Sequence, residues 1–170
     1  MAIFLCGFMG CGKTTIGKNL AKLLGCGYCD MDELIVKKAG MSIPEIFETK
    51  GEKHFRQMES DLIIELGSFK GIVSCGGGAM LNEQNGKNAA ENGTVLFLDT
   101  PFEICYKRIA GDSNRPIAAS RTKEQLEELY NERYPKYLKN SGMRVDCSGT
   151  PMEISKYIIQ SLKPVSYTHL

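Results

Sequence analysis

Short apolar segments alternate along the chain with longer amphipathic ones, as they do in parallel α/β proteins. The apolar segments carry few polar positions, which is typical of buried strands, and cover residues 2–6, 28–30, 71–75, 94–98 and 143–146. Segments with helical spacing separate each strand from the next. This alternation predicts an α/β fold, an open parallel five-stranded sheet flanked by helices on both faces. Ligands of such a sheet bind beyond the carboxyl ends of its strands.

Local start and stop signals place the helices between these strands. A helix over residues 12–24 carries Ile16 and Leu20 on one face and stops at Gly25, a residue suited to the left-handed conformation past a helix end. Ser42-Ile-Pro-Glu45 is a capping box with Pro in the first turn, so another helix begins there. The other expected helices cover residues 32–39, 51–66, 82–92, 101–109, 123–134 and 151–162. Residues 110–122 remain as one long irregular stretch, and such stretches are often functional.

Length and charge limit the classes of protein to which the chain can belong. Its 170 residues correspond to one domain of ordinary size, placed at 1–163, and 21 basic against 20 acidic side chains leave a formal charge of +1. This balance gives no general field for nucleic acid or an anionic membrane, so we expect neither partner. The apolar residues 1–8 are too short to span a bilayer and lack the features of a signal peptide. We therefore expect a cytoplasmic protein.

The cysteines and the C-terminus add two exclusions. Seven cysteines are an odd number in a chain that does not look secreted, which favours free thiols. Cys26 and Cys29 have the spacing of a redox or zinc pair, but no second pair exists and the chain has only two histidines. We expect no structural metal site. Residues 164–170 fit no element, and 166–170 resemble translated adapter sequence, so we leave this tail out of the domain.

The first candidate chemistry follows the first strand. Gly7-Phe-Met-Gly-Cys-Gly-Lys-Thr14 matches the phosphate loop pattern G-x-x-x-x-G-K-[ST], between a strand and a helix as that motif requires. About one random chain of this length in two hundred would contain the pattern. Its glycines let backbone N–H groups surround phosphates at the positive end of the helix. We expect the lysine to reach the terminal phosphates and Thr14 to bind Mg²⁺; the nucleotide-binding segment is Gly10, Cys11, Gly12, Lys13, Thr14 and Thr15.

Several other nucleotide-binding classes do not fit the rest of the chain. GTPases need a guanine-reading N-K-x-D sequence, which is absent. Asp146-Cys-Ser-Gly149 matches the switch pattern D-x-x-G but lies too near the C-terminus to serve as one. The glycines of the loop are out of register for the G-x-G-x-x-G of a Rossmann fold, and the chain is too small for a large ATPase motor. A small kinase fits best.

Polar residues after the second and third strands supply candidates for an acceptor site. Asp30 and Asp32 lie at the tip of the second strand, where carboxylates could serve Mg²⁺ and an acceptor hydroxyl, although Asp32 could instead cap a helix. Each arginine taken singly is more often a solvated surface charge than a ligand. Their order behind a phosphate loop favours function, in the segments Phe55-Arg-Gln-Met-Glu59, Gly76-Gly-Gly78, Asn114-Arg-Pro116 and Asn131-Glu-Arg-Tyr-Pro135.

This set of segments resembles the shikimate kinase family over residues 3–162. Many families share the phosphate loop, but the succession of D-x-D, F-R-x-x-E, G-G-G, R-P and E-R-x-P-x-Y is specific to this one. The resemblance implies a P-loop kinase fold with a mobile lid over about 110–122 and an acceptor-binding region over about 31–62. It also implies ATP-dependent phosphorylation of the 3-hydroxyl of shikimate, in chorismate and aromatic amino-acid biosynthesis, with Mg²⁺ as cofactor.

Family roles follow position by position from the resemblance. Lys13, Asp32 and Arg115 are implied as catalytic, with Arg115 the lid arginine. ATP is bound by the phosphate loop together with Arg108 and Arg115, and the metal by Thr14 and, through water, by Asp30. Shikimate binding is implied for Asp32, Arg56, Gly77, Gly78 and Arg133. A carboxylate held by guanidinium forks, hydroxyls held by an aspartate and a ring approached by glycine backbone agree with this assignment.

Some positions depart from the family or leave a choice open. The strand before the glycines ends in Ser74 and Cys75 without an acidic residue, so Asp30 and the Ser74 hydroxyl are expected to hold the metal's water. Residues 146–151 lack a basic residue against adenine. Cys11 is either a reactive thiolate at a helix N-terminus or an inert small residue. We expect a monomer; the rival hypotheses are another small-molecule or nucleoside monophosphate kinase, with Arg56 and Arg133 gripping a phosphate, and a non-catalytic nucleotide-binding module.

Overall fold

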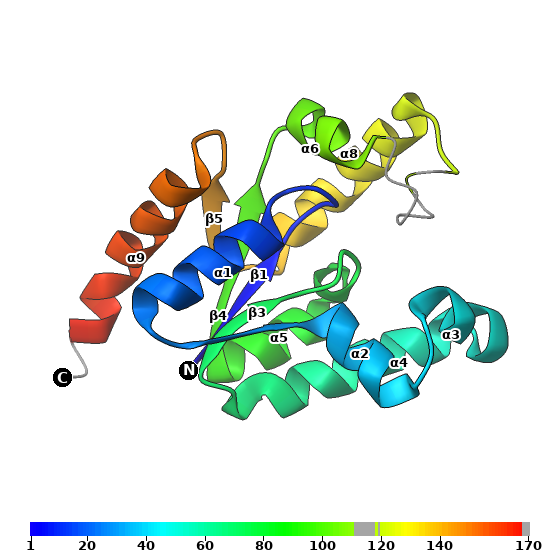
Figure 1. Ribbon diagram of the computed structural model, residues 1–170, viewed down its shortest axis with the longest axis horizontal. Helices are drawn as coiled ribbons and strands as arrows, with labels where there is room; N and C mark the ends of the chain where they lie inside the picture. Colours follow the sequence, from blue (N-terminus) through cyan, green and yellow to red (C-terminus); the bar gives the residue numbers. More distant parts are fainter. Residues whose placement is uncertain (111–117, 119, 168–170) are drawn as a thin grey trace.

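The computed structural model describes residues 1–110, 118 and 120–167, the last five of them as backbone only. Five parallel strands form one sheet in the order β2-β3-β1-β4-β5, which confirms the predicted fold class (Figure 1). The strands are β1 (Ala2–Cys6), β2 (Gly27–Asp30), β3 (Gly71–Ser74), β4 (Gly93–Asp99) and β5 (Met143–Asp146). β1 and β4, the two clearest apolar runs of the sequence, pair with each other in the middle of the sheet. Most of their side chains are buried in the core.

The helices follow the predicted order, with two short 3₁₀ turns that the sequence pattern did not indicate. Their bounds are α1 (Lys13–Leu24), α2 (Met31–Ala39), α3 (Ile43–Lys50), α4 (Glu52–Glu65), η1 (Leu66–Ser68), η2 (Ala79–Leu81), α5 (Glu83–Asn92), α6 (Phe102–Ile109), α8 (Lys123–Lys139) and α9 (Pro151–Tyr167). Helices α1 and α9 pack together on one face of the sheet, whereas α4 and α5 pack together on the other (Figure 1). In the described residues no helix is long and apolar enough to cross a membrane.

Two predicted helix ends are wrong. The helix expected to stop at Tyr134 continues through Pro135 to Lys139. Pro135 is exposed, and the next turn is held by Tyr137, which is buried, and by Asn140, whose side chain donates to the carbonyl of Met80 (2.9 Å). Tertiary contacts therefore outweigh the backbone hydrogen bond that proline removes. The last helix likewise extends from residue 162 to Tyr167, so most of the tail is helical.

The carboxyl ends of the strands bring the motif segments to one edge of the sheet. The phosphate loop follows β1, and the Gly76–Gly78 segment follows β3, its neighbour. Asp30 pairs in register with Ser74, so β3 lies between the aspartate and the phosphate loop strand. Helices α2, α3 and α4 project from the same side as a separate arm (Figure 1).

Candidate active site

The phosphate loop has a backbone that only glycine adopts easily. Gly10 and Gly12 have φ of 77° and 107°, and Gly12 forms the N-cap of α1 in the left-handed conformation. A Cβ at Gly10 would lie 2.8 Å from the carbonyl oxygen of Cys105 on α6, so the loop packs directly on that helix. The first residues of α1, Lys13 to Thr15, line a cavity, which is where phosphate binding at a helix N-terminus needs them.

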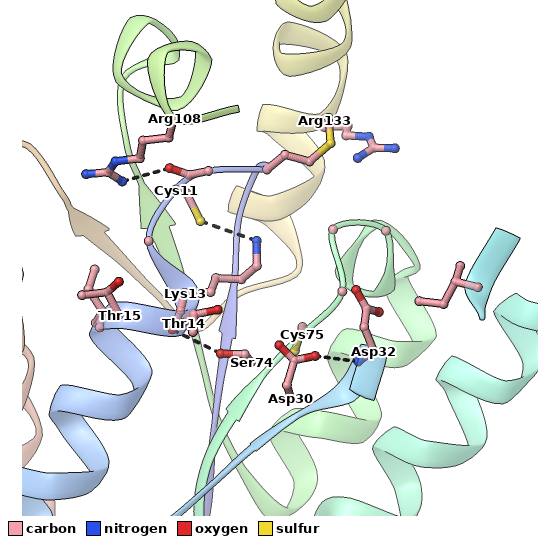
Figure 2. A pocket seen from close by; sticks show the side chains of 18 of the residues that line it. Cys11, Lys13, Thr14, Thr15, Asp30, Asp32, Ser74, Cys75, Arg108 and Arg133 are labelled. Carbon is pink, nitrogen blue, oxygen red and sulfur yellow. Dashed lines mark hydrogen bonds between the residues drawn. The ribbon is translucent and has the colours of Figure 1, made fainter. Parts of the chain in front are cut away.

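Lys13 is folded back over its own loop. Its Nζ donates to the carbonyls of Gly7 (2.7 Å) and Phe8 (3.3 Å) and lies 3.6 Å from the sulfur of Cys11 (Figure 2). Burial by itself lowers the pKa of Lys13, but its interactions with Cys11 and Tyr137 outweigh burial, and the pKa lies above the ordinary value of 10.5. The side chain is thus a fixed cation within the loop that phosphates would enter.

The structure favours the interpretation of Cys11 as an inert small residue over that of a reactive thiolate. Its side chain is 2% exposed and packs against Gly7, where a Cβ would lie 2.7 Å from the sulfur. A thiol enclosed in this way presents no surface to an alkylating reagent. All seven cysteines are free, as expected, and the described residues contain no group of three or more His, Cys, Asp or Glu side chains that could hold a metal ion.

The metal side of the site consists of oxygen atoms from three elements. Asp30 caps α2 and accepts hydrogen bonds from the N–H groups of Asp32 (2.9 Å) and Glu33 (3.2 Å), so the capping role considered for Asp32 belongs to Asp30. Ser74 donates to the carbonyl of Lys13 (3.2 Å) and accepts from the hydroxyl of Tyr28 (3.0 Å). Its own proton is therefore committed, and the hydroxyl can serve a metal-bound water only as an acceptor. Thr14 is exposed beside it (Figure 2).

Asp32 faces the glycine segment from the first turn of α2. A Cβ on Gly76 would lie 2.7 Å from its Oδ1. Burial and the nearby charge of Asp30 raise the pKa of Asp32, while Lys13 and Arg56 partly offset them. This carboxylate therefore holds a proton more readily than an ordinary aspartate, which suits an acceptor of hydroxyl protons.

Arg56 on α4 is held by an acidic residue to which the sequence argument assigned no role. Its guanidinium contacts the carboxylate of Glu59 at 2.7 Å, and Glu59 is only 1% exposed. Burial raises the pKa of Glu59 although the Arg56 hydrogen bond lowers it. The ring of Phe55 lies 5.3 Å from the guanidinium carbon. The signal for Glu59 was present in F-R-x-x-E, where the i,i+3 spacing places both side chains on one helix face.

The glycine segment forms a tight turn that lies close to the guanidinium groups of both Arg56 and Arg133. The N–H of Ala79 donates to the carbonyl of Gly76 (3.2 Å), which closes a four-residue turn. A Cβ on Gly78 would overlap the Arg56 guanidinium, and one on Gly77 would lie 3.5 Å from Nη1 of Arg133. Arg133 reaches this turn from α8 (Figure 2). Two guanidinium groups therefore meet at one glycine turn.

On the far side of the loop, Arg108 of α6 donates to the carbonyl of Gly10 (2.9 Å). It lies beside the phosphate loop on the side away from Arg133 (Figure 2). The same cavity is also lined by Cys147, Gly149, Pro151 and Ile154. Arg115 and most of the proposed lid lie outside the described residues.

One cavity of about 810 Å³ joins these groups. Its walls contain every described residue to which the sequence assigned a site role: Gly10, Cys11, Gly12, Lys13, Thr14, Thr15, Asp30, Asp32, Arg56, Gly77, Gly78, Arg108 and Arg133. The cationic phosphate loop forms one end, and Asp32 with the two arginines and the glycine turn forms the other. Such an arrangement can hold a polyphosphate and a small anionic polyol together.

Comparison with known proteins supports this picture. A family model described as shikimate kinase matches residues 9–163. Curated proteins with that name from Persephonella marina and Bacillus subtilis are each 40% identical, covering 95% of this chain and 98% and 88% of theirs. The structure of a shikimate kinase from Acinetobacter baumannii in complex with shikimate has a TM-score of 0.87 at 37% identity, covering 96% of this chain and 93% of that one.

More distant structures share the fold alone. A gluconokinase from Sinorhizobium meliloti matches with a TM-score of 0.59 at 14% identity, and a deoxyadenosine kinase from M. mycoides with 0.61 at 16%. Kinases with different names therefore share the open P-loop kinase sheet. The family model, by contrast, spans nearly the whole chain. This chain belongs to the shikimate kinase family.

Proposed function

We propose that the chain transfers the γ-phosphoryl group of ATP to the 3-hydroxyl of shikimate, forming shikimate 3-phosphate and ADP. The observation that carries this proposal is the convergence of Asp32, Arg56 and Arg133 on a glycine turn, in the same cavity as the phosphate loop. Shikimate is a ring with one carboxylate and three hydroxyls. Two guanidinium groups and one carboxylate complement it at opposite edges.

Each side chain has a role that its surroundings support. Arg56 and Arg133 bind the substrate carboxylate, and Glu59 holds Arg56 in place through their 2.7 Å contact. Asp32 binds the shikimate hydroxyls. It takes the proton of the attacking hydroxyl while the oxygen of that hydroxyl bonds to the γ-phosphorus. The bond from that phosphorus to the β–γ bridging oxygen breaks, and ADP leaves with the electron pair. Positioning and charge neutralisation account for most of the catalysis in such a transfer.

Lys13 moves between two sets of partners in this reaction. In the structure its ammonium group is bound to the carbonyls of Gly7 and Phe8. Phosphate oxygens entering the loop are stronger acceptors because they carry charge, so they displace these carbonyls. The lysine then offsets the negative charge that develops on the β–γ bridging oxygen.

The oxygen atoms near the loop fit Mg²⁺. Three oxygen atoms are available: the exposed Thr14 hydroxyl, the second oxygen of Asp30 and the Ser74 hydroxyl as an acceptor. Mg²⁺ is usually held by a few such oxygen ligands from the protein, while phosphates and water complete its coordination. Thr14 would bind the ion directly, and Asp30 and Ser74 would accept from its water. When bound, the ion neutralises charge on the phosphates.

The setting of the reaction follows from the same proposal. We infer one kinase domain over residues 1–163, in which residues 31–62 contribute the acceptor arm. It acts as a cytoplasmic monomer in aromatic amino-acid biosynthesis, without nucleic acid or membrane. The near-neutral formal charge of +1 supports the absence of those two partners.

Release of ADP coupled to NADH oxidation tests the proposal directly. The purified protein is given MgATP with shikimate, quinate, gluconate, deoxyadenosine or AMP in turn. We expect turnover with shikimate at least a hundredfold above that with the other four. Equal or greater turnover with AMP would support the nucleoside monophosphate kinase alternative, and no turnover with any of the five would refute the proposed function.

A further inference from the structure

The last motif singled out in the sequence, E-R-x-P-x-Y, contains a tyrosine to which the proposed reaction assigns no role. Tyr137 lies one helical turn after Arg133 on α8 and is 1% exposed. Its hydroxyl donates to the carbonyl oxygen of Gly77 at 2.5 Å. Gly77 and Gly78 face the main cavity, whereas Tyr137 packs behind the turn against Phe97. The hydroxyl therefore contacts the turn from the side away from the substrate.

The turn that Tyr137 contacts has two possible arrangements of its central peptide. Gly76 to Ala79 is closed by one backbone hydrogen bond, and Gly78 has φ −102° and ψ −10°, the values of a type I turn. In a type II turn the central peptide is rotated by about half a turn, and its third residue needs positive φ. Glycine at that position accepts either conformation with little cost. Local sequence therefore leaves the orientation of the Gly77–Gly78 peptide open.

The hydroxyl of Tyr137 removes this freedom. The peptide is planar and trans, so the Gly77 carbonyl and the Gly78 N–H point in opposite directions. Because the carbonyl is bound behind the turn by Tyr137, the N–H faces the other way, toward the cavity. Within the described part of the chain, the N–H of Gly78 donates to no backbone carbonyl. It is therefore free to bind a ligand.

We propose that Tyr137 is a positioning residue that orients the Gly77–Gly78 peptide, so that the Gly78 N–H joins Arg56 and Arg133 in binding the carboxylate of the acceptor. This inference rests on the proposed function. The two arginines already meet at this turn, and a carboxylate between them has lone pairs left for a backbone donor. Burial raises the pKa of Tyr137 although Lys13 and Arg133 lower it, so the hydroxyl keeps the proton that it donates.

Tyr137→Phe tests the inference because it removes the hydroxyl and keeps the buried ring. Tyr134→Phe is the matched control, since it removes a hydroxyl from the same helix that is bound to Asp99 (2.6 Å) instead of the turn. We expect Tyr137→Phe to raise KM for shikimate, and its Kd by calorimetry without nucleotide, about tenfold, as for loss of one donor to a charged group. KM for ATP should stay within twofold, and Tyr134→Phe should leave both KM values unchanged.

Methyl shikimate, which lacks the carboxylate charge, separates orientation of the peptide from general packing. If Tyr137 acts through the carboxylate, wild type and Tyr137→Phe should bind the ester equally, although both bind it weakly. The inference would be overturned if Tyr137→Phe raised the Kd of the ester and of the acid equally, or if Tyr134→Phe raised the Kd of shikimate as much as Tyr137→Phe does. An unchanged Kd for shikimate in Tyr137→Phe would also overturn it.

A measurement on the wild-type protein keeps the inference testable if Tyr137→Phe does not fold. The amide resonance of Gly78 should shift on addition of shikimate and stay in place with methyl shikimate. A Gly78 amide resonance that does not shift on addition of shikimate would refute the inference. Wild-type protein that does not phosphorylate shikimate would instead refute the proposed function, so the two failures are distinguishable.

Discussion

The two ends of the cavity are built in different ways. The centre of the phosphate end is one continuous segment, residues 7–15, a glycine loop that carries its own lysine and leads into α1, with Arg108 beside it. The acceptor end is assembled from four segments that are distant in sequence: α2, α4, the turn after β3, and α8. The side chains that this end presents to the cavity include the charged Asp32, Arg56 and Arg133. Under the proposed function, a local motif therefore specifies the nucleotide, whereas the acceptor site exists only after the sheet has formed.

The largest expected effect tests whether the phosphate end relies on one side chain. Lys13→Ala should lower kcat about a thousandfold, because it removes the loop's cation from the transferring phosphate. The backbone N–H groups remain, so KM for ATP should change much less. Lys18→Ala on the exposed side of α1 is the control and should keep normal kcat. If Lys13→Ala retained more than about a tenth of wild-type kcat, the loop would not be the centre of the chemistry.

Asp32→Asn should lower kcat about a hundredfold or more while it stabilises the protein. Because burial raises the pKa of Asp32, the folded state favours the protonated carboxyl, and the free energy of unfolding falls as the pH rises from 3.8 through the folded-state pKa. An asparagine has no such penalty, so the melting temperature should exceed that of wild type at pH 7. The difference should shrink as the pH falls toward 3.8.

The control for this substitution is Asp61→Asn, an exposed carboxylate on α4 that accepts from Gln57 (2.8 Å). It should leave kcat unchanged, and it should not raise the melting temperature at pH 7 as Asp32→Asn does. Paired melting curves from pH 4 to pH 8 provide the measurement. An Asp32→Asn protein that melts below wild type at pH 7 would contradict the burial argument, whatever its activity.

Substitution of Arg56 or Arg133 should change KM for shikimate, whereas Lys13→Ala and Asp32→Asn change kcat. Arg56→Lys or Arg133→Lys keeps the charge but loses the two-pronged guanidinium, so KM for shikimate should rise about tenfold or more with little change in KM for ATP. Initial-rate kinetics with each substrate varied in turn measures both. Arg144→Lys is a matched control, because this arginine is bound to Asp99 (2.6 Å) and does not line the cavity. Equal changes in both KM values would mean that the two ends are not independent.

Gly78→Ala should have a smaller effect on KM for shikimate than substitution of either arginine. The new methyl group overlaps the Arg56 guanidinium, which is the mobile end of a long side chain, so the arginine shifts instead of the turn breaking. We expect a rise of a fewfold in KM for shikimate and a small loss of stability. Gly142→Ala, where the new methyl lies 3.5 Å from the carbonyl of Val95, should leave both kinetic constants unchanged.

Thiol modification should have the smallest effect. Cys26 and Cys29 on the edge of the sheet are partly exposed, whereas Cys11 and the other four are buried. Iodoacetamide should therefore modify at most Cys26 and Cys29 in the native protein and leave kcat unchanged. Mass spectrometry of the labelled peptides identifies the sites. Inactivation that MgATP prevents, and that Cys11→Ala abolishes, would restore the reactive interpretation of Cys11.

The contrast between the two ends also explains which parts the sequence could predict. The five strands, their parallel arrangement and the phosphate loop follow from local patterns, because each depends on residues that are adjacent in the chain. The i,i+3 spacing of Arg56 and Glu59 signals their partnership, but it does not show that Glu59 is buried. The cap at Asp30 was missed because either aspartate of D-x-D could precede the start of the helix. The helix through Pro135 was missed because its last turn depends on Tyr137 and Asn140 packing against distant segments.

Two tyrosines of α8, Tyr130 and Tyr137, connect the two ends of the cavity to the intrinsic fluorescence of the protein. The chain has no tryptophan, so tyrosines dominate its intrinsic emission. The hydroxyl of Tyr130 donates to the carbonyl of Thr100 (2.8 Å), and the Thr100 hydroxyl donates to the carbonyl of Cys11 in the phosphate loop (2.8 Å). Tyr137 contacts the glycine turn at the opposite end. We therefore expect occupation of either end to change the emission of a tyrosine on this helix, so that binding is followed by intrinsic fluorescence without any attached dye.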